Sequence, residues 1–167
     1  MRRAEATGAA IGGGLALLGA GIRMGADGAE LARLLILGLA LGAVVATDLA
    51  KHRIPNRIVV PAAIACAGLL AVQAVRPQQL LGGIAFVALM LGMSLAWPTS
   101  FGMGDVKLAV LLVVGLGSLA TQALVFGLVL AAAFGALLML RYGRMAARWS
   151  MPLAPFLSAG AAVAVLL

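Results

Sequence analysis

Seven apolar segments, separated by short polar joints, account for almost the whole chain. Their approximate bounds are 8–23, 31–50, 58–75, 79–97, 105–118, 120–140 and 152–167. A helix needs about 20 residues to cross the hydrocarbon core, and most segments approach that length, although the first, fifth and last are shorter. The alternating polar and apolar pattern of a membrane barrel is missing. We therefore predict an all-α polytopic membrane protein, a bundle of about seven transmembrane helices.

Composition supports a membrane protein and argues against a nucleic-acid partner. The chain is 64% hydrophobic and 10% charged, whereas soluble domains are about 25% charged. Its net charge is +7, but the basic residues fall in short clusters between the apolar runs, as in loops at an anionic membrane surface. We expect the lipid bilayer as a partner and no nucleic acid. The single cysteine, Cys66, excludes an intrachain disulfide and a cysteine-based zinc site, and we interpret it as a packing residue.

Prolines and one glycine-containing turn mark the joints between the segments. The turn spans residues 115–118, and the prolines are Pro55, Pro61, Pro77, Pro98 and Pro152. Neither a soluble domain nor a long linker fits between these joints. Gly38 and Gly42 have the small-xxx-small spacing that lets helices approach closely, and we expect it to serve packing within the monomer. The sequence does not determine an oligomeric state.

The placement of basic residues predicts the orientation, because cytoplasmic loops collect Lys and Arg. With the amino terminus inside, the opposite side keeps only Arg23, Arg33 and Arg76, and its first loop also holds Asp27 and Glu30. The cytoplasmic side then holds nine of the twelve basic residues: Arg2, Arg3, Lys51, Arg53, Arg57, Lys107, Arg141, Arg144 and Arg148.

The first segment has two interpretations. Arg2 and Arg3 before a glycine- and leucine-rich stretch are also typical of a secretory signal peptide, whose removal would leave six helices. A clear small-x-small cleavage site is missing before Arg23, so we expect the segment to be retained. Residues 1–30 are therefore predicted to form an accessory amino-terminal helix and loop, apart from residues 31–167.

Two of only five acidic residues lie at the edges of apolar runs. Asp48 ends one predicted helix and Asp105 begins another that runs in the opposite direction, both at the cytoplasmic boundary. A carboxylate at a membrane boundary is costly to maintain, which indicates function. Two carboxylates held close cannot both ionise comfortably and can share a proton, so one can act as a base and the other as an acid.

Three motifs in this order resemble the type IV prepilin peptidase family. Asp48 is followed after five residues by Ile54-Pro55-Asn56, and Gly102-x-Gly104-Asp105-x-Lys107 comes about fifty residues later. The segment Pro152-Leu-Ala-Pro155-Phe-Leu, with Gly160, is similar to the one that opens the last helix of that family. The resemblance spans residues 31–167.

The resemblance implies a membrane aspartic endopeptidase of the Gly-x-Gly-Asp class in the prokaryotic cytoplasmic membrane. Such enzymes cut the basic leader from prepilins and pseudopilins at the cytoplasmic face, and Asp48 and Asp105 would be the catalytic pair. The cysteine-bearing insertion of larger, methylating members is missing. The chain is more similar to the short, peptidase-only members of tight-adherence (Flp) pili, and we expect no metal and no cofactor.

Five further residues are expected to shape the site or bind substrate. Gly102 and Gly104 would give conformational freedom and let a substrate backbone approach Asp105. Lys107 would steer a substrate carboxylate or act on one aspartate, or would serve as a membrane anchor. Pro152 and Pro155 would unwind the start of the last helix and free backbone groups for an extended substrate, or would simply punctuate the loop.

Three alternatives remain open at this level. A small proton- or cation-coupled transporter would use the aspartates as binding groups, although carrier sites usually lie near the midplane. The presenilin and signal-peptide-peptidase class shares the Gly-x-Gly-Asp element, but its other aspartate sits in a Tyr-Asp pair, whereas Thr47 precedes Asp48. An inactive scaffold is disfavoured by the presence of both aspartates.

Overall fold

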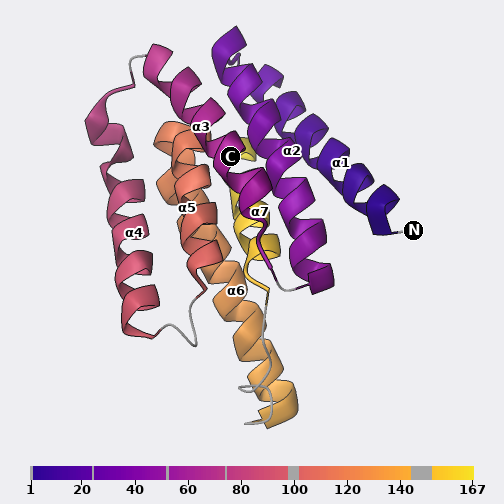
Figure 1. Ribbon diagram of the computed structural model, residues 1–167. Coiled ribbons are helices and arrows are strands. Elements are labelled where there is room, and N and C mark those ends of the chain that lie inside the picture. The colour runs from indigo at the N-terminus through magenta and orange to yellow at the C-terminus, as the bar shows by residue number, and fades with distance from the viewer. Residues whose placement is uncertain (1, 24, 52, 74, 98–101, 144–151) are drawn as a thin grey trace.

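The computed structural model describes residues 2–23, 25–51, 53–73, 75–97, 102–143 and 152–167. Within these ranges the chain is helical and contains no strand, which confirms the predicted all-α class. Figure 1 shows the helices running roughly side by side, and Pro98, Arg144 and Arg148 lie outside the described residues. The helices are α1 (Arg2–Arg23), α2 (Gly28–Lys51), α3 (Asn56–Val72), α4 (Pro77–Ala96), α5 (Met103–Leu116), the short 3-10 helix η1 (Gly117–Leu119), α6 (Ala120–Tyr142) and α7 (Ala154–Leu166).

Three stretches within the described ranges are long and apolar enough to cross a membrane. They are Gly28–Ala50, Pro77–Ala96 and Met103–Tyr142, and the last contains both α5 and α6. Gly117 adopts a φ of 59° between these two helices, a backbone conformation that favours glycine and lets the chain reverse. Shorter apolar helices occupy Ile11–Arg23, Asn56–Val72 and Ala154–Leu166.

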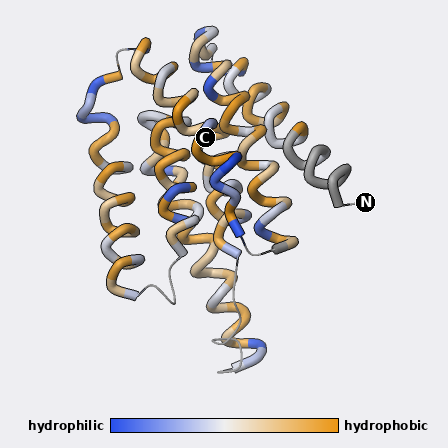
Figure 2. Tube along the Cα trace, viewed as in Figure 1, coloured by the Kyte–Doolittle hydropathy of each residue, from blue (hydrophilic) through white to orange (hydrophobic). Residues whose placement is uncertain are grey.

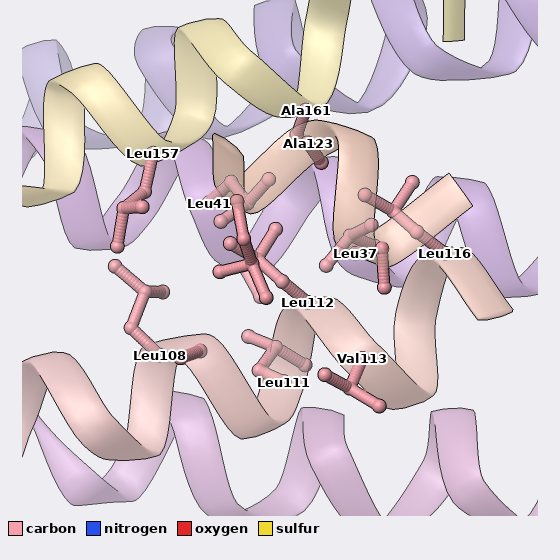
Figure 3. Packing of buried hydrophobic residues seen from close by; sticks show 14 of the residues in the cluster. Leu37, Leu41, Leu108, Leu111, Leu112, Val113, Leu116, Ala123, Leu157 and Ala161 are labelled. Atoms are coloured by element: carbon pink, nitrogen blue, oxygen red, sulfur yellow. The ribbon is translucent and has the colours of Figure 1, made fainter. Parts of the chain in front are cut away.

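The central helix α5 organises the core. Eight of its fourteen residues are buried, and it packs against α2, α3, α4, α6 and α7. Figure 3 shows Leu108 and Leu112 of α5 near Leu157 of α7 and Leu41 of α2. Because lipid tails are as apolar as leucine, such a core holds together through close packing rather than through exclusion of water.

The outer surface of the bundle is also apolar. Ile64, Leu95 and Leu140 are 69%, 69% and 86% exposed, and Figure 2 shows hydrophobic colouring along the outward side of α4. A water-soluble protein rarely exposes so large a contiguous apolar area. This surface fits a bundle whose helices face lipid, as the sequence predicts for a multi-pass membrane protein.

Two expectations about local structure have different outcomes. Pro61 does not mark a joint: it lies inside α3, one turn after the helix begins. Pro55 supplies the break instead, in an extended conformation with φ −77° and ψ 119°. The expectation for the Gly38 spacing is confirmed, because a Cβ on Gly13 of α1 would lie 2.6 Å from the Gly38 carbonyl oxygen of α2.

The crossing of α6 and α7 is similarly tight. A Cβ on Gly160 would meet the Ala123 carbonyl oxygen and the Gly127 backbone nitrogen. A Cβ on Gly127 would in turn lie 2.9 Å from the Leu157 Cα. Because real Cβ atoms do not approach backbone this closely, glycine at both positions allows α7 to lie directly on α6.

We predict that Gly160→Ala destabilises the protein by about 1–3 kcal/mol, because an added methyl group would overpack backbone that cannot move aside. Thermal unfolding of the purified protein in detergent measures the change. Gly68→Ala is the matched control, since an added Cβ there meets nothing within 4 Å. Equal unfolding midpoints for the two variants would contradict the proposed tight crossing.

Candidate active site

One end of the bundle gathers the three segments that the sequence motifs single out. Here α2 ends, α3 and α5 begin, and the described residues resume at Pro152 before α7. The core residues Val44 and Leu108 belong to one cluster of buried side chains, and each lies about one helical turn from its neighbouring aspartate. The fold therefore brings Asp48 and Asp105 to the same end of adjacent helices.

Asp48 lies in the last turn of α2 and is buried, with 5% of its surface exposed. One of its carboxylate oxygens, Oδ2, accepts a hydrogen bond of 3.3 Å from the backbone N–H of Ala154. Ala154 is the first residue of α7, so its N–H is one of those that the helix itself leaves unpaired. The helix dipole also favours a negative charge at this position.

Asp105 lies in the first turn of α5 and is only partly buried. Its backbone N–H donates a 3.0 Å hydrogen bond to the Gly102 carbonyl, which closes the turn that starts the helix. Its helix packs against α2, the helix that carries Asp48. Gly102 and Met103 beside it are exposed, so this carboxyl group is the more accessible of the two.

Neither glycine of the Gly-x-Gly-Asp motif has a positive φ, and only Gly104 lies where an added Cβ would be crowded. Gly102 has φ −77° and ψ 134°, an extended geometry open to any residue. A Cβ on Gly102 would lie 3.4 Å from Asp105 Oδ2, and one on Gly104 would lie 3.1 Å from the Ile54 Cβ. Gly104 thus lets the segment between α2 and α3 lie against the start of α5, next to Asp105.

Lys107 contacts a side chain that the sequence did not connect to it. Its Nζ donates a 3.0 Å hydrogen bond to Asn56 Oδ1, in the first turn of α3. The N-cap position of that helix belongs to Pro55 and lacks a side-chain hydrogen bond. The Asn56–Lys107 hydrogen bond instead ties the start of α3 to the start of α5.

The prolines of the last motif precede or open α7. Pro152 lies before the helix, and Pro155 occupies its first turn, where a missing backbone N–H costs nothing. The freed N–H of Ala154 pairs with Asp48 rather than remaining open. Sequence reasoning missed this contact because backbone donors leave no trace in residue identity; the proline-punctuated helix start was the only available signal.

The two carboxyl groups lack the partners that a three-ligand metal site would need within the described ranges. No cluster of three or more His, Cys, Asp or Glu side chains occurs there. The polar contacts described near the two aspartates are the Ala154 N–H on Asp48 and the Asn56–Lys107 hydrogen bond. Carboxyl groups can give and take protons, so the chemistry that these two side chains offer is acid–base chemistry.

Comparison with known proteins identifies the family. Residues 34–140 match the type IV leader peptidase family, a range that covers more than half of the chain and contains both aspartates. No curated protein and no solved structure matches the chain. With its helical membrane fold and its match across five of the seven helices, the chain belongs to the type IV leader peptidase family.

Proposed function

We propose that this peptidase is an aspartic endopeptidase in which Asp48 and Asp105 form the catalytic pair. The observation that carries the proposal is their placement: the two carboxyl groups, from helices far apart in the sequence, lie at the same end of two helices that pack together. Carboxylates are expensive within a membrane domain and are retained where they perform chemistry. Their position at the helix ends also suits a peptide that arrives from the membrane surface.

The mechanism needs one ionised and one protonated carboxyl group. The ionised group takes a proton from a bound water, and the water oxygen attacks the scissile carbonyl carbon. The protonated group hydrogen-bonds to the carbonyl oxygen and then gives its proton to the departing amide nitrogen as the C–N bond breaks. The water's proton remains on the first group, so the two roles have exchanged at the end of the reaction, and a proton transfer restores them.

The surroundings favour one assignment of these roles. Asp48 accepts a hydrogen bond from a backbone N–H at the start of α7, so it suits the role of the ionised base. Asp105 is more accessible and does not share that donor, so it suits the proton-bearing acid. In this assignment Asp48 stays fixed by α7 while Asp105 meets the substrate.

We further propose that the substrates are prepilin or pseudopilin precursors, cut at the cytoplasmic face of a prokaryotic cytoplasmic membrane. The three motifs and the basic residues at the site's end of the bundle support this choice, since a basic side faces the cytoplasm. Residues 31–167 would form the peptidase domain and residues 1–30 an accessory part. Gly102, Gly104, Lys107, Pro152 and Pro155 would shape the site.

Asp48→Asn and Asp105→Asn should each reduce leader removal by about 10²-fold or more, because an amide can neither accept the water's proton nor donate as an acid. Coexpression with a candidate prepilin and the size of the product on a gel measure processing. Glu5→Gln in α1 is the matched control and should process normally. Parental processing by either aspartate variant would refute the catalytic assignment.

The Asn56–Lys107 hydrogen bond makes a distinct prediction about Lys107. If Lys107 acts by positioning α5, Lys107→Met and Asn56→Ala should each lower the rate by up to about tenfold, since an exposed charged hydrogen bond contributes on the order of 1 kcal/mol. The double variant should then be no slower than the slower single variant. Multiplied losses in the double variant would show that Lys107 instead acts on the substrate directly.

The orientation is tested by a reporter fused after Leu167. We expect alkaline phosphatase at this position to be active, which requires export, and a green fluorescent protein fusion to be dim. The physical reason is that α7 starts at the end bearing the aspartates and runs to the opposite end. The reverse pattern would place the aspartates outside and overturn the cytoplasmic assignment.

A further inference from the structure

A second polar site lies at the end of the bundle opposite the aspartates. A cavity of about 210 Å³ is lined by Asp27, Glu30, Arg33, Gln73, Gln79 and Ser118 among others. These residues come from the start of α2, the end of α3, the start of α4 and η1. Arg33 and Asp48 are fifteen residues apart on α2, which is about 22 Å along a helix. The cavity therefore belongs to the other membrane surface and not to the candidate active site.

Arg33 forms the buried wall of this cavity and is not satisfied by its neighbours. Only 4% of its side chain is exposed, yet its Nε and Nη1 lack any hydrogen-bond partner among the described residues. Its one ion pair, from Nη2 to Glu30 Oε1, spans 3.8 Å and is too long for a hydrogen bond. A buried cation is costly unless it is paired and hydrogen-bonded, so an anionic group at the Arg33 wall of the cavity would lower this cost.

The outer part of the cavity carries the opposite charge. Asp27 accepts hydrogen bonds from the Glu30 backbone N–H at 2.7 Å and from Gln73 Nε2 at 3.0 Å. These two donors lower the pKa of Asp27, which keeps it ionised at neutral pH. Gln73 Oε1 is buried without a hydrogen-bond partner, and the Glu30 side chain is 38% exposed. The carboxylates of Asp27 and Glu30 thus lie at the mouth of the cavity, where they suit an ammonium group.

The charges and the size together select the ligand. Asp27, Glu30 and Arg33 sum to a formal charge of −1, which disfavours a simple anion despite the arginine. A cavity of about 210 Å³ is smaller than a site for a drug-sized molecule. A small group that carries both a phosphate and an ammonium satisfies both halves of the cavity.

We propose that this cavity binds a phosphoethanolamine group, with the phosphate on Arg33 and the ammonium on Asp27 and Glu30. The position of the cavity at the helix ends matches the depth at which phospholipid headgroups lie. An ethanolamine phospholipid of the bilayer and free phosphoethanolamine offer the same chemistry. The proposal is independent of the proposed peptidase mechanism, because none of these residues contributes to the aspartate pair.

The test compares lipids that differ only in the headgroup. Purified protein is equilibrated with phosphatidylethanolamine, phosphatidylcholine or phosphatidylglycerol of identical acyl chains, and retained lipid is counted by native mass spectrometry. We expect one phosphatidylethanolamine per chain, preferred over the other two by about tenfold or more. Equal retention of phosphatidylglycerol would overturn the ammonium half of the site, and equal retention of all three lipids would overturn the proposal.

Variants locate the binding in the cavity. Arg33→Gln removes the cation, and Ser118→Trp fills the mouth from an exposed position without altering Arg33. Both should reduce the headgroup preference to within about twofold, whereas Arg76→Gln, which removes a nearby exposed arginine, should leave it unchanged. If Arg33→Gln does not fold, Ser118→Trp decides. An undiminished preference in Ser118→Trp would refute the assignment to this cavity.

A last experiment distinguishes free phosphoethanolamine from the phospholipid headgroup as the ligand. Lipid-depleted protein in detergent is heated with millimolar phosphoethanolamine or with the phospholipid. A rise of the unfolding midpoint with the soluble compound supports free phosphoethanolamine as a ligand, and a rise with the phospholipid alone supports a headgroup anchored by its acyl chains. No rise with either compound would contradict the proposal, since a bound ligand stabilises the folded state.

Discussion

The hydrogen bond from the Ala154 N–H to the Asp48 carboxylate is the contact on which the arrangement of the site depends. A buried carboxylate needs a donor, and here the donor exists only because α7 starts at that residue. The start of α7 is in turn fixed by its crossing with α6, where Gly127 and Gly160 allow backbone to touch backbone. The position of one aspartate therefore depends on packing two helices away from it.

Asp105 is positioned in a different way. Its helix, α5, is surrounded by five others, so its first turn cannot shift without disturbing the core. Gly104 lets Ile54 lie against that turn, and the Asn56–Lys107 hydrogen bond joins α5 to α3 at the same level. One carboxyl group is thus held by a hydrogen bond and the other by the rigidity of its helix. Two acids with different surroundings can take different roles in a reaction.

The sequence was sufficient for the class of fold, and it placed Asp48 and Asp105 at helix ends, where the structure has them. Apolar length reveals membrane helices, and charged residues at their edges stand out because they are rare. The prediction that Pro61 marks a joint was wrong, because a proline within an early turn of a helix looks the same in sequence as one at a joint. The Ala154 donor could not be predicted, since a backbone N–H is common to nearly all residues.

Long-range side-chain pairs were equally hidden. Lys107 and Asn56 are separated by 51 residues, and only the packing of α3 on α5 brings them together. The cavity around Arg33 collects residues from four elements, each of which reads in sequence as an ordinary polar residue at a helix end. Such sites arise from the relative heights of helices, which a hydropathy pattern does not specify.

The brevity of α5 has a consequence for how the membrane insulates the protein. Fourteen helical residues rise about 21 Å, whereas a typical hydrocarbon core is about 30 Å thick. Polar groups lie near both ends of this helix, with Asp105 at one end and Arg33 beside Gly117 at the other. The part of the bundle between these polar groups is therefore shorter than the surrounding hydrocarbon core is thick. Where water reaches both ends of this helix, a voltage across the bilayer falls over the shorter path, and the local electric field inside the protein is steeper than in the lipid around it.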